Sequence, residues 1–394
     1  MAQTDVFFVG TARTAIGSYG GALKDIPLVD LATVAVTGAL AHAGIDGGNV
    51  GHVVMGNVVP TEPRDAYLSR VAAVNAGITL ETPAFNVNRL CGSGLQAIVS
   101  AAQGILLGDY GVAVAGGAES MSRGPYMLPN LRWGSRLGDT QAVDYMNGIL
   151  HDPWKRTHMG ITAENIAERY GISRDRQDQL ALESQRRAAR AITEGRFKTQ
   201  IVPVQVQVKR QAVQFEIDEN VRGNLDFEQL SQMQPVFQQG GTVTAGNASS
   251  LNDGAAALVL ADANAITQHN LRPLARLVAY AHAGVEPDYM GIGPVPATRM
   301  VLKKAGLSIR DIDVIESNEA FAAQACAVAQ KLEFDPEKVN INGSGISLGH
   351  PVGATGAVIT IKAIHELQRV GGRYALVTMC IGGGQGIAAI LERV

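Results

Sequence analysis

The stretch AFNVNRLCGSGLQAIVSAAQGILLGDYGVAVAG (84–116) decides the fold of this chain. Residues 84–88 and 112–116 predict two strands, and residues 93 to about 107 predict an amphipathic helix between them. Apolar strands that alternate with helices are typical of parallel sheets covered by helices. The stretch therefore predicts an α/β fold.

The C-terminal part of the chain repeats this order. There the strand VNIN (339–342), a glycine-rich turn at His350, a helix to about Arg369 and the strand ALVTM (375–379) follow one another. Before these segments, AGI (43–45) and AGL (305–307) each predict a helix that stops at a glycine ahead of a strand, at a constant offset of 262 residues. A repeat this long indicates two duplicated α/β halves.

Residues 121–249 differ from both flanks, because they carry 16 Lys and Arg and 14 Asp and Glu side chains but only 11 glycines. Within them, Ser173 predicts a helix cap ahead of LALESQRRAARAI (180–192), and IVPVQVQV (201–208) alternates as a strand does. We expect this segment to be a more solvent-exposed insertion into a scaffold that the two flanks form by tight packing.

The composition excludes several classes of protein. With 394 residues, of which 46% are hydrophobic and 18% charged, the chain is expected to form two or three folded domains rather than to stay disordered. Its 45 glycines have no period of three, which excludes a collagen-like fibre. The formal net charge of −3 gives no reason to expect a nucleic acid as partner.

We expect a soluble protein of the cytoplasm. No stretch approaches the roughly 18 uncharged apolar residues of a membrane helix, and no secretory or transit segment precedes the strand predicted in MAQTDVFFVG (1–10). Cys91, Cys326 and Cys380 lie far apart, so neither a disulfide framework nor a CxxC metal site is expected.

Cys91 is the first candidate for chemistry. NRLCGSG (88–94) places it after a strand and at the start of a helix, where the helix dipole favours thiolate and lowers the pKa of the thiol. The glycines at 92 and 94 would let a ligand approach the backbone closely. The alternative is a buried cysteine that acts as a small hydrophobic residue.

His350 is the second candidate. GHPVGATG (349–356) places it at a helix cap, ahead of a proline at the first helical position, on the same side of its sheet as Cys91 in the other half. A lone histidine is more often structural. The glycines at 345, 349, 353 and 356 weaken that alternative, because they remove bulk around the ring.

Two further motifs follow strands. CIGGGQG (380–386) is a glycine-rich turn that can aim several backbone N–H groups at one point, as an oxyanion hole requires, and phosphate binding is the alternative. SNEAF (317–321) offers Asn318, for which a helix cap is the alternative. A thiolate, a histidine, a second thiol and a glycine-rich turn together suit acyl transfer through a thioester intermediate.

These motifs closely resemble the thiolase family. NxxCGSG, NEAF, GHPxGATG and CxGGGxG occur in that family's order and approximate spacing, and TVTAGNAS (242–249) and HMGITAEN (158–165) are similar to it as well. The resemblance runs from ARTAIG (12–17) to the last strand, and it looks most like the bacterial acetyl-CoA acetyltransferases, or β-ketothiolases. It implies a five-layer αβαβα fold of two βαβαβαββ halves with an inserted loop domain. It also implies reversible condensation of acetyl-CoA with acyl-CoA, or thiolysis of β-ketoacyl-CoA.

The resemblance further implies roles for single residues. Cys91 would be the acylated nucleophile. His350 would activate it and, with a water held by Asn318, would bind the thioester oxygen of the second substrate. Cys380 would move the α-proton, and the N–H groups of Cys91 and Gly382 would form the other oxyanion hole. For coenzyme A, the matching positions are Leu150, His158, Met159, Arg222, Ala245, Ser249 and Phe321.

The organisation of the molecule is also implied. Residues 1–120 plus 250–270 would form the N-terminal half, 121–249 the loop domain for coenzyme A binding and tetramerisation, and 271–394 the C-terminal half. Acetyl-CoA, acyl-CoA, β-ketoacyl-CoA and coenzyme A would be substrates rather than cofactors, and no metal is expected. The implied assembly is a homotetramer, a dimer of dimers.

Some positions depart from the family pattern, and alternatives remain. Gln385, Ser317, Ser250 and the Gly-Asn pair after Arg222 put the acyl-chain preference and the nucleotide contacts in doubt. A related condensing enzyme with a single catalytic cysteine would lack Cys380, and a Rossmann dehydrogenase needs a GxGxxG motif that opens no βαβ unit here. The remaining alternative is a degenerate thiolase-like protein that binds acyl-CoA or lipid without turnover.

Overall fold

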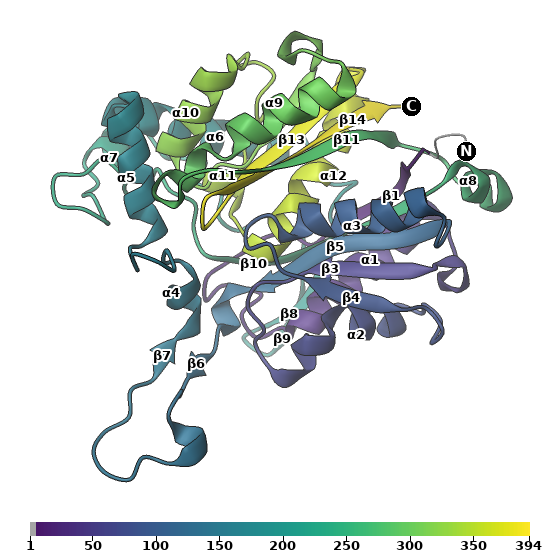
Figure 1. The fold of residues 1–394 in the computed structure, drawn as a ribbon, viewed down its shortest axis with the longest axis horizontal. Coiled ribbons are helices and arrows are strands. Elements are labelled where there is room, and N and C mark those ends of the chain that lie inside the picture. Colours follow the sequence, from purple (N-terminus) through teal and green to yellow (C-terminus); the bar gives the residue numbers. More distant parts are fainter. Residues whose placement is uncertain (1–4) are drawn as a thin grey trace.

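A computed structural model describes residues 5–394, and Figure 1 shows a mixed sheet flanked by helices. Ten strands make up the main sheet: β1 (Phe7–Arg13), β2 (Gly17–Ser18), β3 (His52–Gly56), β4 (Ala84–Val87), β5 (Val112–Ser120), β10 (Asn252–Ala261), β11 (Ala275–Gly284), β12 (Val314–Ser317), β13 (Tyr374–Ile381) and β14 (Gln385–Arg393). Their order is β12-β13-β14-β11-β1-β10-β5-β3-β4, with β2 paired to β10.

The sheet consists of two halves that meet at β1 and β11. These two strands pair only through Phe7 with Arg276 and Phe8 with Ala275. On one side of this junction the order is β3-β5-β10-β1, and on the other it is β12-β13-β14-β11. Gly44 and Gly306 end the helices before β3 and β12, each with a φ of +67°. The predicted duplication of two α/β halves is confirmed.

The prediction of parallel sheets is only partly correct. β3 is parallel to β4 and β5, and β12 is parallel to β13. The remaining pairs are antiparallel. For β13 and β14 the reason is the connection, since Gly382–Gly384 is long enough for a hairpin turn but far too short for a parallel crossover.

The predicted strand VNIN (339–342) is wrong. Only Val339 forms an isolated bridge, to Ile315, where the other half has the full strand β4. Asn340 has a left-handed φ of +48°, which turns the chain away from the sheet. Its side chain accepts from the N–H of Ser317 at 2.9 Å and donates to the Ser317 carbonyl at 2.8 Å, and so replaces the hydrogen bonds of a strand.

Helices form three layers around the two sheet halves. α3 (Ser93–Leu107) and α12 (Val352–Val370) pack against each other and lie between the halves, where α3 contacts β3 and β5 and α12 contacts β12 and β13. α1 (Leu28–Ala43) and α2 (Leu68–Asn75) cover the outer face of one half, and α9 (Pro294–Ala305) with α10 (Ala322–Leu332) covers that of the other. This is the five-layer arrangement that the resemblance implied.

The segment that contains α3 is apolar enough to contradict one expectation from the sequence, that no stretch is close to a membrane helix in length and composition. Leu90–Leu107 is 18 residues long with a mean hydropathy of 1.5, which is enough by length and composition to cross a membrane. The expectation that no stretch approaches this limit is therefore wrong. However, 67% of the segment is buried inside the fold, where α3 packs on α12 and the sheet, so its apolar composition suits a core helix.

The chain between β5 and β10 packs on both halves. It contains β6 (Tyr126–Met127), β7 (Val143–Asp144), α4 (Tyr145–Ile149), α5 (Met159–Tyr170), α6 (Arg174–Thr193), β8 (Val204–Val208), β9 (Gln211–Phe215) and α7 (Phe227–Ser231). Ser173 caps α6 and the strand β8 forms, as predicted. α6 packs on α10, while β8 adds Val204 and Val206 to the core around α1. The domain boundaries at 121 and 249 stay a prediction.

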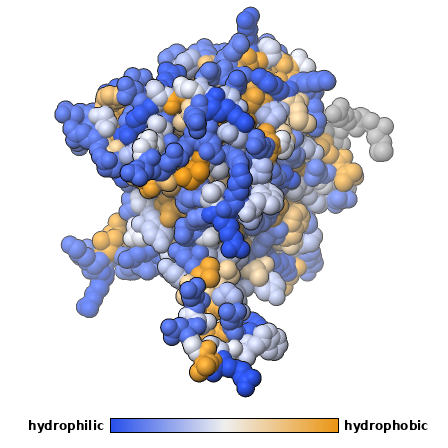
Figure 2. Space-filling model, turned by 60° about the vertical axis from the view of Figure 1, so that its left-hand side comes forward, coloured by the Kyte–Doolittle hydropathy of each residue, from blue (hydrophilic) through white to orange (hydrophobic). Residues whose placement is uncertain are grey.

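An arm between β6 and β7 projects from the body of the molecule (Figures 1 and 2). Figure 2 shows apolar side chains on it, and the most exposed of these are Trp133 at 91% and Leu137 at 97%. The remaining elements are the helices α8 (Ala263–His269) and α11 (Gly345–Leu348) and the 3₁₀ turns Gly47–Asn49, Pro63–Tyr67, Met121–Arg123, Leu131–Trp133, Pro287–Ile292 and Ile309–Asp311.

Candidate active site

The ends of several strands surround a cavity of about 440 Å³. Cys91 follows β4, Cys380 lies near the end of β13, and His350 precedes α12. The predicted site residues that line this cavity are Cys91, Leu150, His158, Met159, Arg222, Ala245, Ser249, Phe321, His350, Cys380 and Gly382. Asn318, the other predicted site residue, contacts His350. The structure thus brings all the predicted positions together around one cavity.

Cys91 lies directly before Gly92, the N-cap residue of α3. Its own N–H and the N–H of Gly382 hydrogen-bond with its thiol and lower the thiol's pKa. Burial acts in the opposite direction and dominates, so the pKa of Cys91 is raised above its ordinary value. The prediction that the helix terminus lowers this pKa is therefore wrong in its net direction, and the resting residue is a thiol.

Gly94, one of the two glycines beside Cys91, serves helix packing rather than ligand approach. A Cβ on Gly94 would lie 2.7 Å from the backbone nitrogen of Ala357, and one on Gly356 would lie 2.2 Å from that of Leu95. Real Cβ atoms do not come this close, so α3 and α12 can touch backbone to backbone only without these side chains. The prediction that Gly94 exposes the backbone to a ligand is corrected accordingly.

His350 is buried, with both ring nitrogens in contact with a neighbour. Nδ1 lies 2.6 Å from Oγ1 of Thr355, and Nε2 lies 3.3 Å from Nδ2 of Asn318. The His350 backbone N–H donates to Oδ1 of Asn252 at 2.8 Å. Burial lowers the pKa of His350 to about 4, so the ring is neutral at pH 7 and can accept a proton. Pro351, and not His350 as predicted, is the N-cap residue of α12.

Asn318 does not cap a helix. α10 begins at Ala322, with Phe321 at its N-cap and no side-chain capping bond. The Asn318 backbone N–H donates to the carbonyl of Thr378 at 3.0 Å, which fixes the residue against β13. Within residues 5–394, Oδ1 of Asn318 is buried and has no hydrogen-bond partner. Asn318 therefore keeps a free acceptor beside His350.

Cys380 is fully buried, and its surroundings keep it protonated. Burial and the neighbouring Cys91 raise the pKa of its thiol. The turn that follows needs glycine, because Gly383 and Gly384 have φ values of +80° and +85°. This turn places the N–H of Gly382 against the Cys91 thiol, which matches the expectation of a backbone donor aimed into the site. No strand-to-helix transition follows the turn, so it is not built like a dinucleotide-binding loop.

Two of the predicted coenzyme A positions have titratable side chains: the charged Arg222, and His158, whose ring is held in place by its neighbours. Arg222 is exposed and is the one residue with a full charge among those that line the cavity. His158 is the N-cap residue of α5, accepts the N–H of Gly160 on Nδ1 at 3.0 Å, and stacks on Phe237 with ring centroids 4.6 Å apart. Burial, followed by the nearby His151, lowers the pKa of His158 to about 4. Among residues 5–394, no group of three or more His, Cys, Asp or Glu side chains could hold a metal ion.

Sequence reasoning missed several wall residues, namely Val58, Met121, Phe237, Met290 and Val352. Phe237 stacks on His158 and meets Phe321 edge-on, with centroids 6.1 Å apart. It is a single aromatic residue in the polar loop QMQPVFQQGG (232–241), so no periodicity or motif singled it out.

A buried carboxyl group, which no sequence pattern singled out, links the two halves beside the cavity. Glu119 of β5 accepts the N–H groups of Val58 at 3.1 Å, Val59 at 2.9 Å and Gly353 at 2.8 Å. Gly353 belongs to the first turn of α12, where its N–H has no partner within the helix. Burial raises the pKa of Glu119 to about 8 although the three N–H groups oppose this shift. Glu119 thereby fixes the start of the helix that follows His350.

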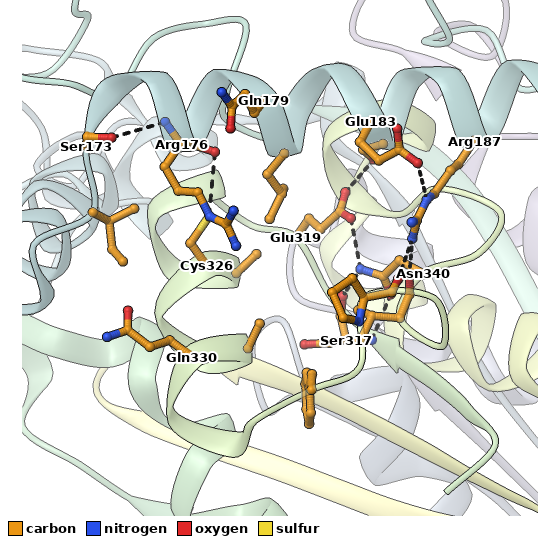
Figure 3. Close-up of a pocket in the computed structure, with 18 of the residues that line it drawn as sticks. Ser173, Arg176, Gln179, Glu183, Arg187, Ser317, Glu319, Cys326, Gln330 and Asn340 are labelled. Carbon is orange, nitrogen blue, oxygen red and sulfur yellow. Dashed lines mark hydrogen bonds and ion pairs between the residues drawn. The ribbon is translucent and has the colours of Figure 1, made fainter.

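A second cavity of about 790 Å³ lies between α6 and α10 (Figure 3). Ser317 and Glu319, the neighbours of Asn318, both line it. Glu319 accepts a hydrogen bond from Ser184 at 2.6 Å and another from Asn340 at 2.8 Å. These bonds fix the loop that carries Asn318. Cys326 lines this cavity and not the first one, and burial raises the pKa of its thiol to about 11. We therefore expect Cys326 to play no part in activity.

The chain is similar to known proteins over its whole length. Residues 6–264 match the family described as thiolase, N-terminal domain, and residues 271–393 match thiolase, C-terminal domain. It is 62% identical to the β-ketothiolase BktB of Cupriavidus necator over 391 residues, which cover 99% of each chain. It is 46% identical to the acetyl-CoA acetyltransferase of Chromobacterium violaceum, with 99% of this chain and 100% of the relative covered.

Solved structures agree with this result. The crystal structure of human mitochondrial 3-ketoacyl-CoA thiolase superimposes with a TM-score of 0.98 at 44% identity, and 100% of both chains is covered. The structure of that human protein in complex with CoA superimposes with a TM-score of 0.96 at 45% identity, covering 100% of this chain and 98% of the other. Because both domains match over nearly all residues, the chain belongs to the thiolase family.

Proposed function

We propose that this protein is a β-ketothiolase that transfers an acyl group between coenzyme A thioesters through an acyl-cysteine at Cys91. One observation carries the proposal: two thiols, Cys91 and Cys380, and a neutral histidine, His350, line the same cavity. Acyl transfer through a thioester needs a thiol nucleophile, a base to deprotonate it and preformed donors for the oxyanion, and these residue types supply all three.

In the first half of thiolysis, His350 takes the proton of Cys91, and the thiolate attacks the β-carbonyl carbon of β-ketoacyl-CoA. The bond between the α- and β-carbons breaks, and its electron pair goes to the α-carbon. Cys380 gives its proton to that carbon, so acetyl-CoA leaves and the shortened acyl group stays on Cys91. The N–H groups of Cys91 and Gly382 would bind the oxyanion of this step.

In the second half, the thiol of coenzyme A gives its proton to Cys380 and attacks the acyl carbon. The bond from that carbon to the Cys91 sulfur breaks, and Cys91 recovers its proton from His350. Run in reverse, the same steps condense acetyl-CoA with acyl-CoA, and in that direction Cys380 removes the α-proton. His350 and a water held by Asn318 would bind the oxygen of the second thioester.

Coenzyme A would lie along Leu150, His158, Met159, Arg222, Ala245, Ser249 and Phe321. Arg222 can meet its phosphates, because it carries the one full charge among the residues that line the cavity. The neutral ring of His158 and the apolar wall suit the uncharged pantetheine part. In this proposal coenzyme A and its thioesters are substrates, and the reaction requires no metal or other cofactor.

The assembly and compartment are further parts of the proposal. A homotetramer would bury the apolar side chains of the arm between β6 and β7, including Trp133 and Leu137, against another subunit. The loop domain at 121–249 would thus serve both coenzyme A binding and tetramerisation. The three cysteines are free, and two of them must stay reduced for the mechanism, which suits the cytoplasm.

A thiolysis assay over a series of β-ketoacyl-CoA substrates, starting with acetoacetyl-CoA, tests the function. We expect coenzyme A-dependent cleavage by the wild-type enzyme and by Cys326→Ala, and none by Cys91→Ala. The series also shows which acyl lengths fit the cavity. Tight binding of acyl-CoA with no cleavage by the wild type would favour a degenerate binding protein, an alternative that the full-length similarity to named enzymes does not favour.

A further inference from the structure

The two contacts of the His350 ring differ in kind. Nε2 faces an amide that can donate a proton, Nδ2 of Asn318 at 3.3 Å. Nδ1 faces a hydroxyl, Oγ1 of Thr355 at 2.6 Å, and a hydroxyl can either donate or accept. What the hydroxyl does therefore decides which nitrogen of the neutral ring carries the proton.

The position of Thr355 on α12 determines where its hydroxyl proton goes. Thr355 lies in the first turn of the helix, and its Oγ1–H donates to the carbonyl of Pro351, four residues earlier, at 2.9 Å. A hydroxyl has a single proton, so Oγ1 is left to accept from Nδ1 of His350. Nδ1 then carries the ring proton and Nε2 has a free lone pair. The contact with Asn318 agrees with this, because an amide N–H donates to a bare nitrogen.

We infer that Thr355 is a positioning residue that holds His350 in the tautomer protonated on Nδ1, so that Nε2 is free to take the proton of Cys91. This inference rests on the proposed function, in which His350 is that base. When the proton arrives, the ring becomes imidazolium and its Nδ1–H keeps the same acceptor, so no group near it has to turn. In serine proteases a buried carboxylate performs this task, whereas here a neutral hydroxyl performs it.

Burial supports the need for such a residue. His350 and Thr355 are 5% and 2% exposed, so water cannot replace the Thr355 oxygen as acceptor. The neighbouring supports of His350 act on its backbone rather than on its ring: Asn252 accepts its N–H, and Glu119 accepts the N–H of Gly353. The choice of tautomer thus depends on Thr355 and Asn318 alone among the hydrogen-bond partners of the ring in residues 5–394.

The test uses the whole enzyme and three variants. Thr355→Val keeps the shape and removes the hydroxyl, Thr355→Ser restores the hydroxyl, and Thr360→Val is the matched control. Thr360 is equally buried on the same helix and donates to the carbonyl four residues back, that of Gly356 at 2.7 Å, but it has no contact with His350. Each variant is assayed for the rate of Cys91 acylation by acetyl-CoA and for kcat and KM in thiolysis.

We expect Thr355→Val to slow acylation and kcat by about 10²-fold, the lower end of what general acid–base catalysis contributes, with KM little changed. Thr355→Ser should recover most of the rate, and Thr360→Val should match the wild type. Acylation by Thr355→Val within twofold of an active wild type would overturn the inference and leave the proposed function standing. An inactive wild type would instead overturn the proposed function.

A measurement on the wild type keeps the inference testable even if Thr355→Val does not fold. Solid-state ¹⁵N NMR of the histidine-labelled enzyme, with His350 assigned by difference from His350→Asn, reports which ring nitrogen carries the proton. We expect a protonated Nδ1 and a bare Nε2 at pH 7. A ring protonated on Nε2 would contradict the inference.

Discussion

Nδ2 of Asn318 lies 3.3 Å from Nε2 of His350, although the two residues come from separate motifs 32 positions apart. The contact joins the end of β12 to the start of α12. It places an uncharged amide, and no carboxylate, beside a histidine whose pKa burial lowers to about 4. The charge at position 318 therefore controls how easily His350 gains a proton.

The variant Asn318→Asp tests this control. A carboxylate at this distance favours the imidazolium and should raise the pKa of His350 by about one to three units. Because the reaction needs neutral His350, activity falls as the pH drops through this pKa. The acid limb of kcat/KM should therefore move to higher pH in Asn318→Asp. Asn318→Ala is the control, which should lose rate but keep the limb of the wild type. Identical limbs in both variants would contradict the account.

The resting state of Cys91 gives a second prediction. Its pKa is raised from 9.0 by burial, and the neutral His350 offers no positive charge to lower it. We expect the thiolate absorbance of the wild type, taken as a difference from Cys91→Ala, to be absent at pH 7 and to appear at a higher pH than that of a free cysteine. A thiolate signal already present below pH 7 would show a resting ion pair between Cys91 and His350.

Helix packing between the halves gives a third prediction. A Cβ on Gly356 would meet the backbone nitrogen of Leu95 at 2.2 Å, which no side-chain rotation can relieve. Gly356→Ala should lower the free energy of unfolding by about 1–3 kcal/mol or more, measured in urea. Gly148→Ala is the control, because nothing lies within 4 Å of a Cβ there. Equal stability of the two variants would show that α3 and α12 can move apart freely.

A buried ion pair gives a fourth prediction. Arg13 of β1 and Asp218 are both fully buried and form two hydrogen bonds, at 2.8 and 2.9 Å. Asp218→Asn leaves the Arg13 charge buried and uncompensated, which should cost about 3–5 kcal/mol of stability. The double variant Arg13→Met/Asp218→Leu should recover most of that loss.

The pair of Arg373 and Glu392 is the control for this prediction, because Arg373 is exposed and Glu392 keeps Arg276 as a second partner. The Arg373 side chain is 68% exposed, so Arg373→Met should change stability by less than about 1 kcal/mol. If Asp218→Asn were as mild as Arg373→Met, the pair would not hold residues 201–219 against β1.

How much could be predicted from the sequence depended on whether a feature is local. The glycine stops at Gly44 and Gly306, the cap at Ser173 and the strand β8 depend on neighbouring residues, and all four are confirmed. The motifs around Cys91, His350 and Cys380 also named residues that do line one cavity. Each of these follows a regular element whose pattern is visible within about ten positions.

The features that the sequence could not reveal depend on distant contacts. Glu119 and Gly353 are separated by 234 positions, and Asn252 and His350 by 98, so no periodicity links them. The prediction for the pKa of Cys91 is wrong because burial outweighs the local helix terminus. VNIN (339–342) has the composition of a strand, but its left-handed Asn340 ends the pairing after Val339. Gly94 belongs to a helix contact that only the assembled halves create.

The division of labour between two thiols is the central claim, and mass spectrometry of Cys380→Ala tests it most directly. The variant is incubated with acetyl-CoA, digested, and compared with Cys91→Ala and the wild type. We predict one acetyl group on the peptide that contains Cys91 in Cys380→Ala, together with no thiolysis of acetoacetyl-CoA. A coenzyme A thiolate can leave without the proton that Cys380 gives it in the wild type, so Cys91 and His350 suffice for acylation, whereas proton transfer at the α-carbon needs Cys380. Normal turnover by Cys380→Ala, or no acetyl group on Cys91, would contradict the two-thiol mechanism.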